Sequence, residues 1–333
     1  MNGLLDRFAS VLERRFLLVA FLPVLIFVVA LTSVAAVAAG ESTELLTAWS
    51  RFPPSVQIVS ILSSLALVWL LAGFVDSQLR NLTQLFEGYP LQAVAPKLAA
   101  RAAAWHVARQ RELSPVLPVS PPPDVKNKIT DEDLAETAKQ SLNTNGRYAE
   151  ELFVLYPEDS DAILPTRLGN IIRAAEDYSE SRYGADYLVV WPRLAHLCSE
   201  RFVQDYELVR ANVDFLLVVS FLSALFGFLG GSIVLIYSGP VALFLASVLF
   251  GFGLAHLSYS SAVSAAVEYG EQIRASVDLY RLDLLRQLKF RQPSNVLEET
   301  AIWSEFDDFL RKGHPRRSNY VFTPRSTDAA PGA

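Results

Sequence analysis

Four long stretches without a charged side chain constrain this chain more than any other feature. They cover residues 16–40, 56–75, 215–237 and 240–267. An α-helix rises about 1.5 Å per residue, so about 20 apolar residues cross the roughly 30 Å hydrocarbon layer of a bilayer. Helices in a soluble core rarely run this far without a charge. The sequence therefore predicts an all-α, four-span helical membrane protein with a helical cytoplasmic domain and stalk, whose fourth span ends near residue 262.

The first stretch has one alternative interpretation, a cleaved signal peptide ending at the small residues "AVAAG". The apolar part of a signal peptide is only about 7–15 residues long. The stretch of residues 16–40 is longer, which favours an uncleaved span.

The basic residues indicate how the spans are oriented. Of the 29 Lys and Arg residues, only Arg51 lies between the first and second spans, and none lies between the third and fourth. Basic residues close to the ends of spans favour the cytoplasmic side. We therefore expect a multi-pass protein with cytoplasmic N- and C-termini and a cytoplasmic central region.

This orientation divides the chain into six segments. Apolar residues at helical spacing within Met1–Phe16 predict an amphipathic helix on the inner membrane surface. Five prolines within Ser114–Pro123 predict an extended linker. The predicted segments are an interfacial amphipathic helix (1–15), a transmembrane hairpin (16–77), a cytoplasmic helical region (78–210) with a Pro-rich linker (114–130), a second transmembrane hairpin (211–267), cytoplasmic helices (268–312) and a disordered tail (313–333).

Small residues recur every four positions in the third and fourth spans. This spacing places each set on one helix face, where small side chains let membrane helices approach closely. We predict that the two spans pack as a tight hairpin, although small residues are also common in membrane helices generally. The predicted helix-packing residues are Ser223, Gly227, Gly231, Ser247, Gly251 and Ala255.

The region after the second span is basic. Residues 78–112 contain five basic and two acidic side chains, a balance that favours anionic lipid headgroups. Pro90 and Pro96 should divide the region into short helices. Membrane lipids are therefore expected partners.

Residues 165–194 hold the densest mixture of Arg, acidic and aromatic side chains. Pro165 is expected in the first turn of a helix, and Gly184 in a left-handed turn after it. The proline after Trp191 disfavours helix there, so a new helix is expected from Pro192. The apolar face of the first helix should consist of Leu168, Ile171, Ile172 and Ala175.

This segment supplies a candidate interaction surface with three interpretations. Its charges could form a lattice of ion pairs, bind a protein partner or lipid headgroup, or take part in catalysis; the lattice is favoured because the segment has acids to pair its arginines. The candidate residues are Arg167, Asn170, Arg173, Glu176, Asp177, Arg182, Tyr183, Asp186, Trp191 and Arg193.

Helical spacing returns after the fourth span. Apolar or small residues recur every three or four positions from Val263 to Leu284, which is typical of a packed stalk helix. A last amphipathic helix is predicted near residues 295–310, capped by Ser294, with Trp303 and Phe306 on its apolar side.

The sequence contains none of the common catalytic or metal-binding motifs. It has no phosphate-binding glycine loop, HExxH, GxSxG or cysteine pair, since Cys198 is the sole cysteine. Its four histidines lack metal-ligand spacing. We therefore expect no catalytic residue, metal or cofactor, and no enzyme activity. The net charge of −6 supplies no basic field for nucleic acid.

Four stretches resemble a group of bacterial, chiefly actinobacterial, multi-span integral membrane proteins. They are "LFEGYP" (85–90), "LPTRLGNIIRAAEDY" (164–178), "RYGADYLVVWPRL" (182–194) and "YGEQIRASVDLYRLDLLRQL" (269–288). The resemblance implies a bacterial plasma (inner) membrane location. It brings no enzyme class, substrate or catalytic residue.

These observations favour a non-enzymatic scaffold, sensor or assembly component that acts through its cytoplasmic domain. A homo-oligomer and a cytoplasmic protein partner both fit this role. An oligomeric channel or transporter is an alternative, but the spans contain no Asp, Glu, Lys or Arg for a proton-coupled path. His256 in the fourth span could handle protons, but a lone histidine there more often bonds a neighbouring serine or a carbonyl. A membrane enzyme acting on a lipid headgroup is the other alternative.

Overall fold

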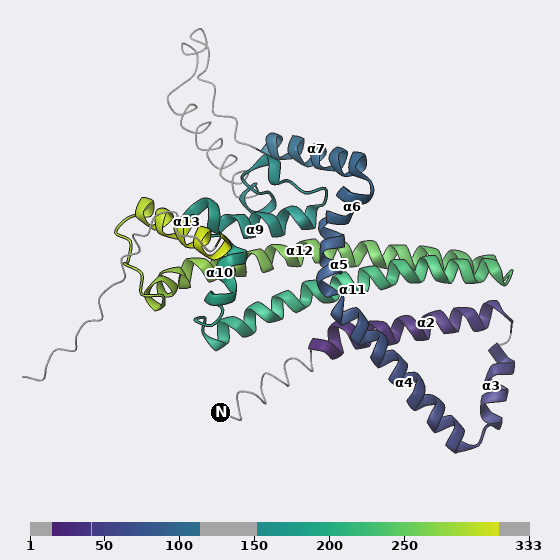
Figure 1. The fold of residues 1–333 in the computed structure, drawn as a ribbon. Coiled ribbons are helices and arrows are strands. Elements are labelled where there is room, and N and C mark those ends of the chain that lie inside the picture. Colours follow the sequence, from purple (N-terminus) through teal and green to yellow (C-terminus); the bar gives the residue numbers. More distant parts are fainter. Residues whose placement is uncertain (1–14, 41, 114–151, 313–333) are drawn as a thin grey trace, which may run out of the picture. The chain divides into compact units, whose positions relative to one another are not determined.

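The computed structural model describes residues 15–40, 42–113 and 152–312. The predicted interfacial helix (except Arg15), the Pro-rich linker and the tail lie outside these residues. The described residues form helices and no β-strand, and four helices are long and apolar enough to cross a membrane (Figure 1). The predicted all-α, four-span class is confirmed, and the chain is a membrane protein.

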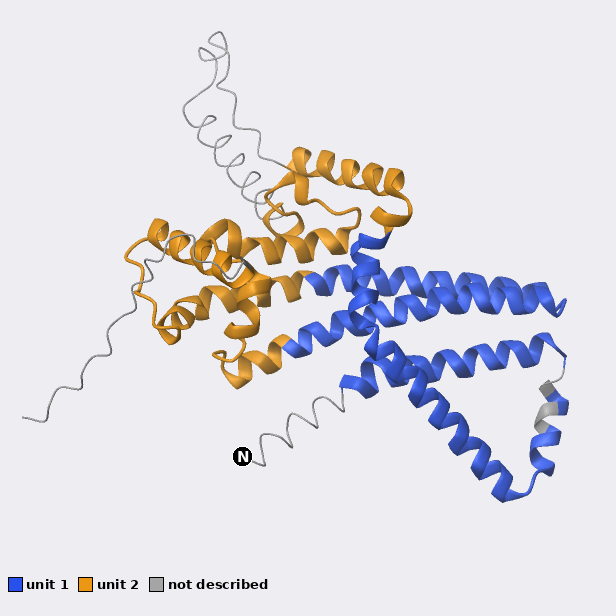
Figure 2. Ribbon diagram, viewed as in Figure 1, with its two compact units in different colours: residues 1–90, 207–266 blue, residues 91–206, 267–333 orange. Residues whose placement is uncertain are grey.

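The chain forms two compact units, coloured separately in Figure 2. Unit 1 comprises residues 1–90 and 207–266, and unit 2 comprises residues 91–206 and 267–333. The two longest helices, α11 (Glu200–Ile236) and α12 (Val241–Gln287), each run without a break through a boundary between the units.

Unit 1 contains the apolar parts of all four candidate spans. Its other helices are η1 (Leu17–Phe21), α2 (Leu22–Ala38), α3 (Ser42–Arg51), α4 (Pro54–Ser77) and α5 (Leu79–Glu87). The π-helical η1 packs on α4, where the Trp69 ring centre lies 5.6 Å from that of Phe21. An Arg15–Asp214 ion pair of 2.7 Å joins the start of the first span to α11.

Glycines bring α11 and α12 into backbone contact. A Cβ atom added to Gly251 would lie 2.5 Å from the Cα of Gly227 and 2.8 Å from the Ser223 carbonyl oxygen. Across the same contact, the Ser220 hydroxyl donates a 2.9 Å hydrogen bond to the Ala255 carbonyl.

The remaining small residues of the two sets also lie at this contact. A Cβ atom on Gly231 would come 2.8 Å from a methyl group of Val248. Ser247 lies opposite Gly230, which the four-residue spacing did not include. The periodicity thus finds the contacting helix faces, while individual partners shift by a residue because two crossing helices do not match position by position.

Unit 2 is built from shorter helices around the end of α12. They are α6 (Tyr89–Val94, whose first two residues belong to unit 1), α7 (Pro96–Leu113), the 3-10 turn η2 (Ser160–Ala162), α9 (Arg167–Tyr183), α10 (Tyr187–Leu194) and α13 (Val296–Lys312). The core includes Ile273, Val277 and Leu284 of α12 together with Trp303 and Phe306 of α13. The predicted apolar faces of both helices are therefore confirmed.

Three local predictions in unit 2 are wrong. Pro165 precedes α9 instead of lying in its first turn, because the hydroxyl of Thr166 caps the helix by accepting from the Gly169 N–H. The cap of α13 is Asn295, whose Oδ1 accepts from the Glu298 N–H, whereas Ser294 contacts the Glu298 carboxylate.

The third wrong prediction concerns Pro192, which lies inside α10 and does not begin a new helix. Asp186 caps this helix by accepting from the Leu188 N–H at 2.8 Å. Trp191 then packs its ring 4.3 Å from the Tyr206 ring. This packing holds Trp191 in a helical conformation that the following proline disfavours.

Candidate functional site

Asn170 belongs to the interior and not to the predicted interaction surface. Its side chain is fully buried. Its Oδ1 accepts a 2.7 Å hydrogen bond from the Leu164 N–H, and its Nδ2 donates a 2.9 Å bond to the Leu164 carbonyl. Asn170 therefore fixes the loop that leads into α9, and its assignment to an exposed surface is wrong.

The buried face of α9 packs against α12. Its side chains Leu168, Ile171, Ile172 and Ala175 are all buried, as predicted. A Cβ atom on Gly270 would lie 3.2 Å from that of Ala175, so the absence of a side chain at Gly270 permits this close approach. Helix α9 is thereby held along α12 with its charged side chains on the other faces.

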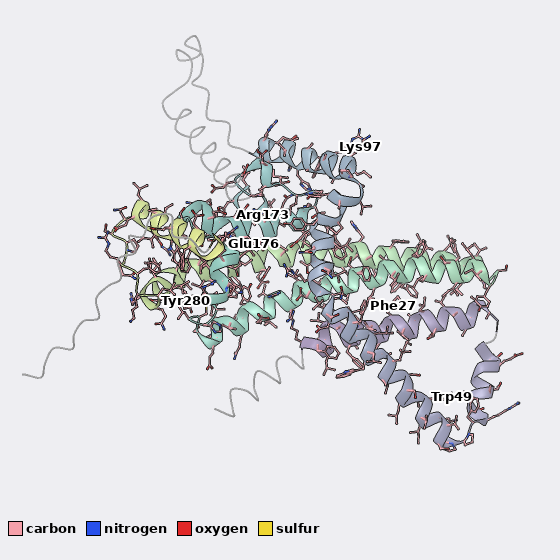
Figure 3. All side chains as sticks on the ribbon, viewed as in Figure 1. Phe27, Trp49, Lys97, Arg173, Glu176 and Tyr280 are labelled. Carbon is pink, nitrogen blue, oxygen red and sulfur yellow. The ribbon has the colours of Figure 1, made fainter. Side chains whose placement is uncertain are left out.

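One ion pair of the expected lattice lies within α9. Arg173 pairs with Asp177 at 3.0 Å, one helical turn away. Burial raises the pKa of Asp177, while the neighbouring Arg173 lowers it. Figure 3 labels Arg173 and Glu176 on this helix. The pair therefore supports α9 from within its own turn.

Two other arginines of the segment use partners that are not carboxylates. The Arg182 guanidinium lies 5.8 Å from the Phe153 ring centre and 5.9 Å from that of Tyr178. Arg193 donates a 2.7 Å hydrogen bond to the Val189 carbonyl. Cation–π and carbonyl contacts thus replace the expected pairs.

Tyr183 takes part in a polar cluster with α12. Its hydroxyl donates a 2.8 Å hydrogen bond to Asp278, which also accepts from Tyr178 at 3.0 Å. Arg281 lies 3.9 Å above the Tyr183 ring and pairs with Glu299 of α13 at 2.8 Å. Burial, followed by the hydrogen bond to Asp278, raises the pKa of Tyr183. The cluster ties α9, α12 and α13 together.

Asp186 and Trp191 also serve packing. Asp186 caps α10 and forms an ion pair with Arg311 of α13. The Trp191 ring stacks on Tyr187 with centres 5.6 Å apart. The Tyr187 hydroxyl lies 3.1 Å from that of Tyr206. Sequence reasoning missed the contributions of α12 and α13, because their side chains follow about a hundred residues later in the chain.

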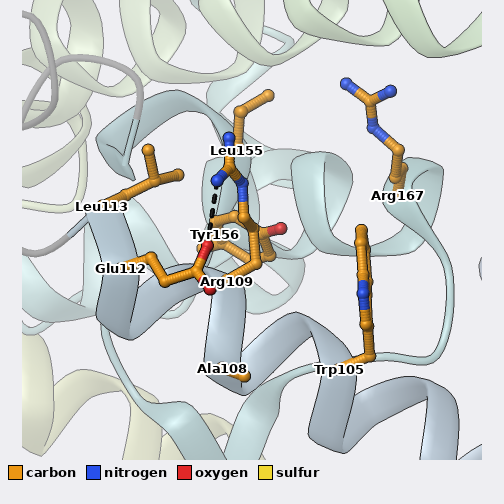
Figure 4. A pocket seen from close by; sticks show the side chains of 8 residues that line it. All are labelled: Trp105, Ala108, Arg109, Glu112, Leu113, Leu155, Tyr156 and Arg167. Carbon is orange, nitrogen blue, oxygen red and sulfur yellow. Dashed lines mark hydrogen bonds and ion pairs between the residues drawn. The ribbon is translucent and has the colours of Figure 1, made fainter.

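Arg167 differs from the other predicted residues because it lines a hollow. This cavity of about 470 Å³ is bounded by α7, by residues 155–156 and by the start of α9 (Figure 4). Arg167 is exposed and forms no ion pair with another described residue. The lining residues are Trp105, Ala108, Arg109, Glu112, Leu113, Leu155, Tyr156 and Arg167.

The hollow combines an exposed ring with cationic groups. Trp105 is 61% exposed, and Figure 4 shows its ring near the end of the cavity where Arg167 stands. Arg109 reaches the same space and pairs with Glu112 at 2.9 Å. Sequence reasoning missed Trp105, although "AAAWHVARQRE" does place an aromatic residue among basic ones.

Buried hydrogen bonds hold the wall of the hollow in place. His106 Nδ1 lies 3.2 Å from the Tyr156 hydroxyl, and Gln110 donates a 2.9 Å bond to the Pro157 carbonyl. Burial lowers the pKa of His106, and the charge of Arg167 lowers it further. Both effects favour the neutral imidazole, so His106 supports α7 as an uncharged group.

The described residues contain no group of three or more His, Cys, Asp or Glu side chains placed to hold a metal ion. Comparisons of the chain with protein-family models, with curated proteins and with solved structures found no match. The resemblance to actinobacterial membrane proteins therefore stays a prediction, and functional inference depends on the geometry of the chain itself.

Proposed function

We propose that the chain is a multi-pass protein of the bacterial plasma membrane, with both termini in the cytoplasm. It acts as a non-enzymatic scaffold, sensor or assembly component by binding a cytoplasmic protein through unit 2. The Trp105 hollow, defined by the eight lining residues named above, is the binding site in this proposal.

One observation carries the proposal. Most of the predicted surface residues have partners inside unit 2, whereas Arg167 lines an open hollow beside an exposed tryptophan. Side chains used for internal packing are poor candidates for a binding surface. An exposed tryptophan next to arginine has the composition of an interface hot spot, because both residue types are enriched there.

The chemistry of the hollow indicates the kind of segment that it would bind. The Arg167 guanidinium can bind a carboxylate through two parallel hydrogen bonds. The Trp105 ring offers an apolar surface for an aromatic or aliphatic side chain. A short acidic segment with one large apolar residue satisfies both groups, and this is the partner we propose.

Site-specific crosslinking in cells tests this function. A photoreactive phenylalanine analogue at Trp105 should crosslink to a discrete protein, and Arg167→Glu should abolish that product. The same analogue at Leu297, which is 84% exposed on α13, serves as the matched control. Crosslinks that are identical at both positions, or unchanged by Arg167→Glu, would contradict the proposal.

The enzymatic alternative has its own experiment. Purified chain would be assayed with nucleotides, phospholipids and peptides in mild detergent. We expect no turnover. Turnover that is lost in Arg167→Ala, with the protein still folded, would replace the binding role with a catalytic one.

A further inference from the structure

The chain turns between α6 and α7 (Figure 1). Ala95 separates the two helices, and its carbonyl accepts hydrogen bonds from the N–H groups of Leu98 and Ala99, each at 3.0 Å. Pro96 occupies the first position of α7, where its missing N–H costs no hydrogen bond. We call the exposed residues at this turn, Leu91, Val94, Lys97, Leu98 and Arg101, the α6–α7 corner.

Large apolar side chains project from the corner into solvent. Val94 is 85% exposed, Leu98 is 63% exposed and Leu91 is 37% exposed. Ala99, on the opposite side of the same turn, is buried. The inward side of the turn is thus packed on the protein, and its outward side presents an apolar tip.

The charged side chains from residue 89 to residue 111 are all basic. Lys97 and Arg101 are exposed and form no ion pair with another described residue. Residues 89–111 contain no Asp or Glu. In Figure 3 the labelled Lys97 side chain extends away from the ribbon. The corner therefore combines exposed apolar groups with uncompensated positive charge.

This combination matches an anionic lipid surface better than it matches nucleic acid. Apolar side chains enter the boundary between headgroups and acyl chains, while Lys and Arg bind the phosphates. Nucleic acid would leave the apolar tip in water. The corner also follows closely after a candidate membrane span in the sequence, because α4 ends at Ser77 and α6 begins at Tyr89. The short connection keeps the corner near the bilayer.

We propose that the α6–α7 corner docks on the anionic leaflet of the membrane that the chain spans. Leu91, Val94 and Leu98 insert at the headgroup boundary, and Lys97 and Arg101 bind lipid phosphates. This contact is independent of the Trp105 hollow. It would anchor unit 2 to the bilayer at a second point, in addition to the continuous helices α11 and α12.

Fluorescence of the full chain in lipid nanodiscs tests the proposal. Cys198→Ser removes the sole cysteine, and Val94→Cys then carries an environment-sensitive probe. The matched control is Leu297→Cys in the same background, since Leu297 is 84% exposed and lies on α13. The discs contain phosphatidylcholine alone or mixed with phosphatidylglycerol, with doxyl-labelled lipid as the quencher.

In phosphatidylglycerol discs, we expect the emission of the Val94 probe to shift to the blue and to be quenched by the doxyl-labelled lipid. The emission of the Leu297 probe should stay that of a probe in water. Reversing both charges (Lys97→Glu with Arg101→Glu) should lower the docking equilibrium by more than roughly 30-fold, because the loss of two basic residues near an anionic surface alone accounts for a factor of about 30. Lys97→Arg should retain docking. Unchanged thermal unfolding of each variant confirms that it is folded.

Two results would overturn the proposal. One is a Val94 probe that is as aqueous as the Leu297 probe in phosphatidylglycerol discs. The other is quenching that is equal in both lipid compositions and insensitive to charge reversal, since contact would then occur without recognition of anionic headgroups.

Discussion

Among the described carboxyl groups of unit 2, Asp307 has the most strongly raised pKa. Its side chain is buried, and its Oδ2 accepts a 2.6 Å hydrogen bond from the Asp186 N–H. Burial raises the pKa of Asp307 to about 7, with further increases from Glu180 and Asp308 that Arg193 partly offsets. The fold therefore keeps a proton on this group at pH values where the unfolded chain releases it.

Asp307→Asn should stabilise the protein at neutral and higher pH. Between the unfolded value of 3.8 and about 7, only the folded state retains the proton, so native stability falls as pH rises through this range. Asn keeps an oxygen that can accept from Asp186 and has no charge to bury. We expect a gain of at least about 1 kcal/mol at pH 8, because one pKa unit corresponds to about 1.4 kcal/mol.

Thermal unfolding followed by tryptophan fluorescence measures this effect, since Trp303 is buried on the same helix. The gain should grow from pH 4 to 7 and then level off. Asp283→Asn is the control, because its exposed carboxylate pairs with Arg286 at the surface. A gain that is independent of pH, or equal in both variants, would show that ionisation of Asp307 is not the cause.

Individual partners were the least predictable part of the candidate site. The sequence placed acids beside the arginines of residues 165–194, and of these the Arg173–Asp177 pair is present because it needs only one helical turn. Asp186 instead pairs with Arg311, and Arg281 with Glu299. Such pairs depend on how distant helices pack, which local spacing does not contain.

At the level of helices, the contact between α11 and α12 depends on missing side chains. Without a hydrophobic driving force between spans, close backbone approach supplies van der Waals contact. Gly251 is buried against the backbone of Gly227, whereas Gly253 has no atom within 4 Å of its added Cβ. Substituting these two glycines of the same helix therefore distinguishes the effect of packing from the effect of helix propensity.

Gly251→Ala should destabilise the protein by about 1–3 kcal/mol, the usual cost of overpacking. The added methyl group would meet backbone atoms at 2.5 Å, so a helix must shift. Gly253→Ala should be neutral or slightly stabilising, because alanine favours helix by about 1 kcal/mol over glycine. Thermal unfolding in one detergent compares them, and equal effects would contradict the packing role.

Long helices were predicted well and short ones less so. Long uncharged stretches predict membrane spans whatever the packing of the helices, and four such helices are present. The buried residues of α12 likewise follow the helical spacing that the sequence predicts. The prediction for α10 was wrong because Pro192 disfavours a helical conformation at Trp191. The packing of Trp191 and the cap by Asp186 outweigh this local preference. Local rules decide an element only where tertiary contacts do not oppose them.

For the whole molecule, the distribution of basic residues predicts the orientation in the membrane. Arg51, at the end of α3, is the only Lys or Arg in the two connections proposed to face outwards. Helix α13 belongs to unit 2 and should face the cytoplasm. The positive-inside rule therefore predicts that α3 and α13 lie on opposite sides of the membrane.

Cysteine labelling in intact cells decides this topology. In a Cys198→Ser background, Thr43→Cys on α3 should react with a membrane-impermeant maleimide added outside. Leu297→Cys on α13 should react only after the membrane is permeabilised, although it is 84% exposed. The reverse labelling pattern would show that the protein has the opposite orientation in the membrane. Because the Trp105 hollow needs a cytoplasmic partner and the α6–α7 corner needs an anionic inner leaflet, inversion would remove the premise of both proposals.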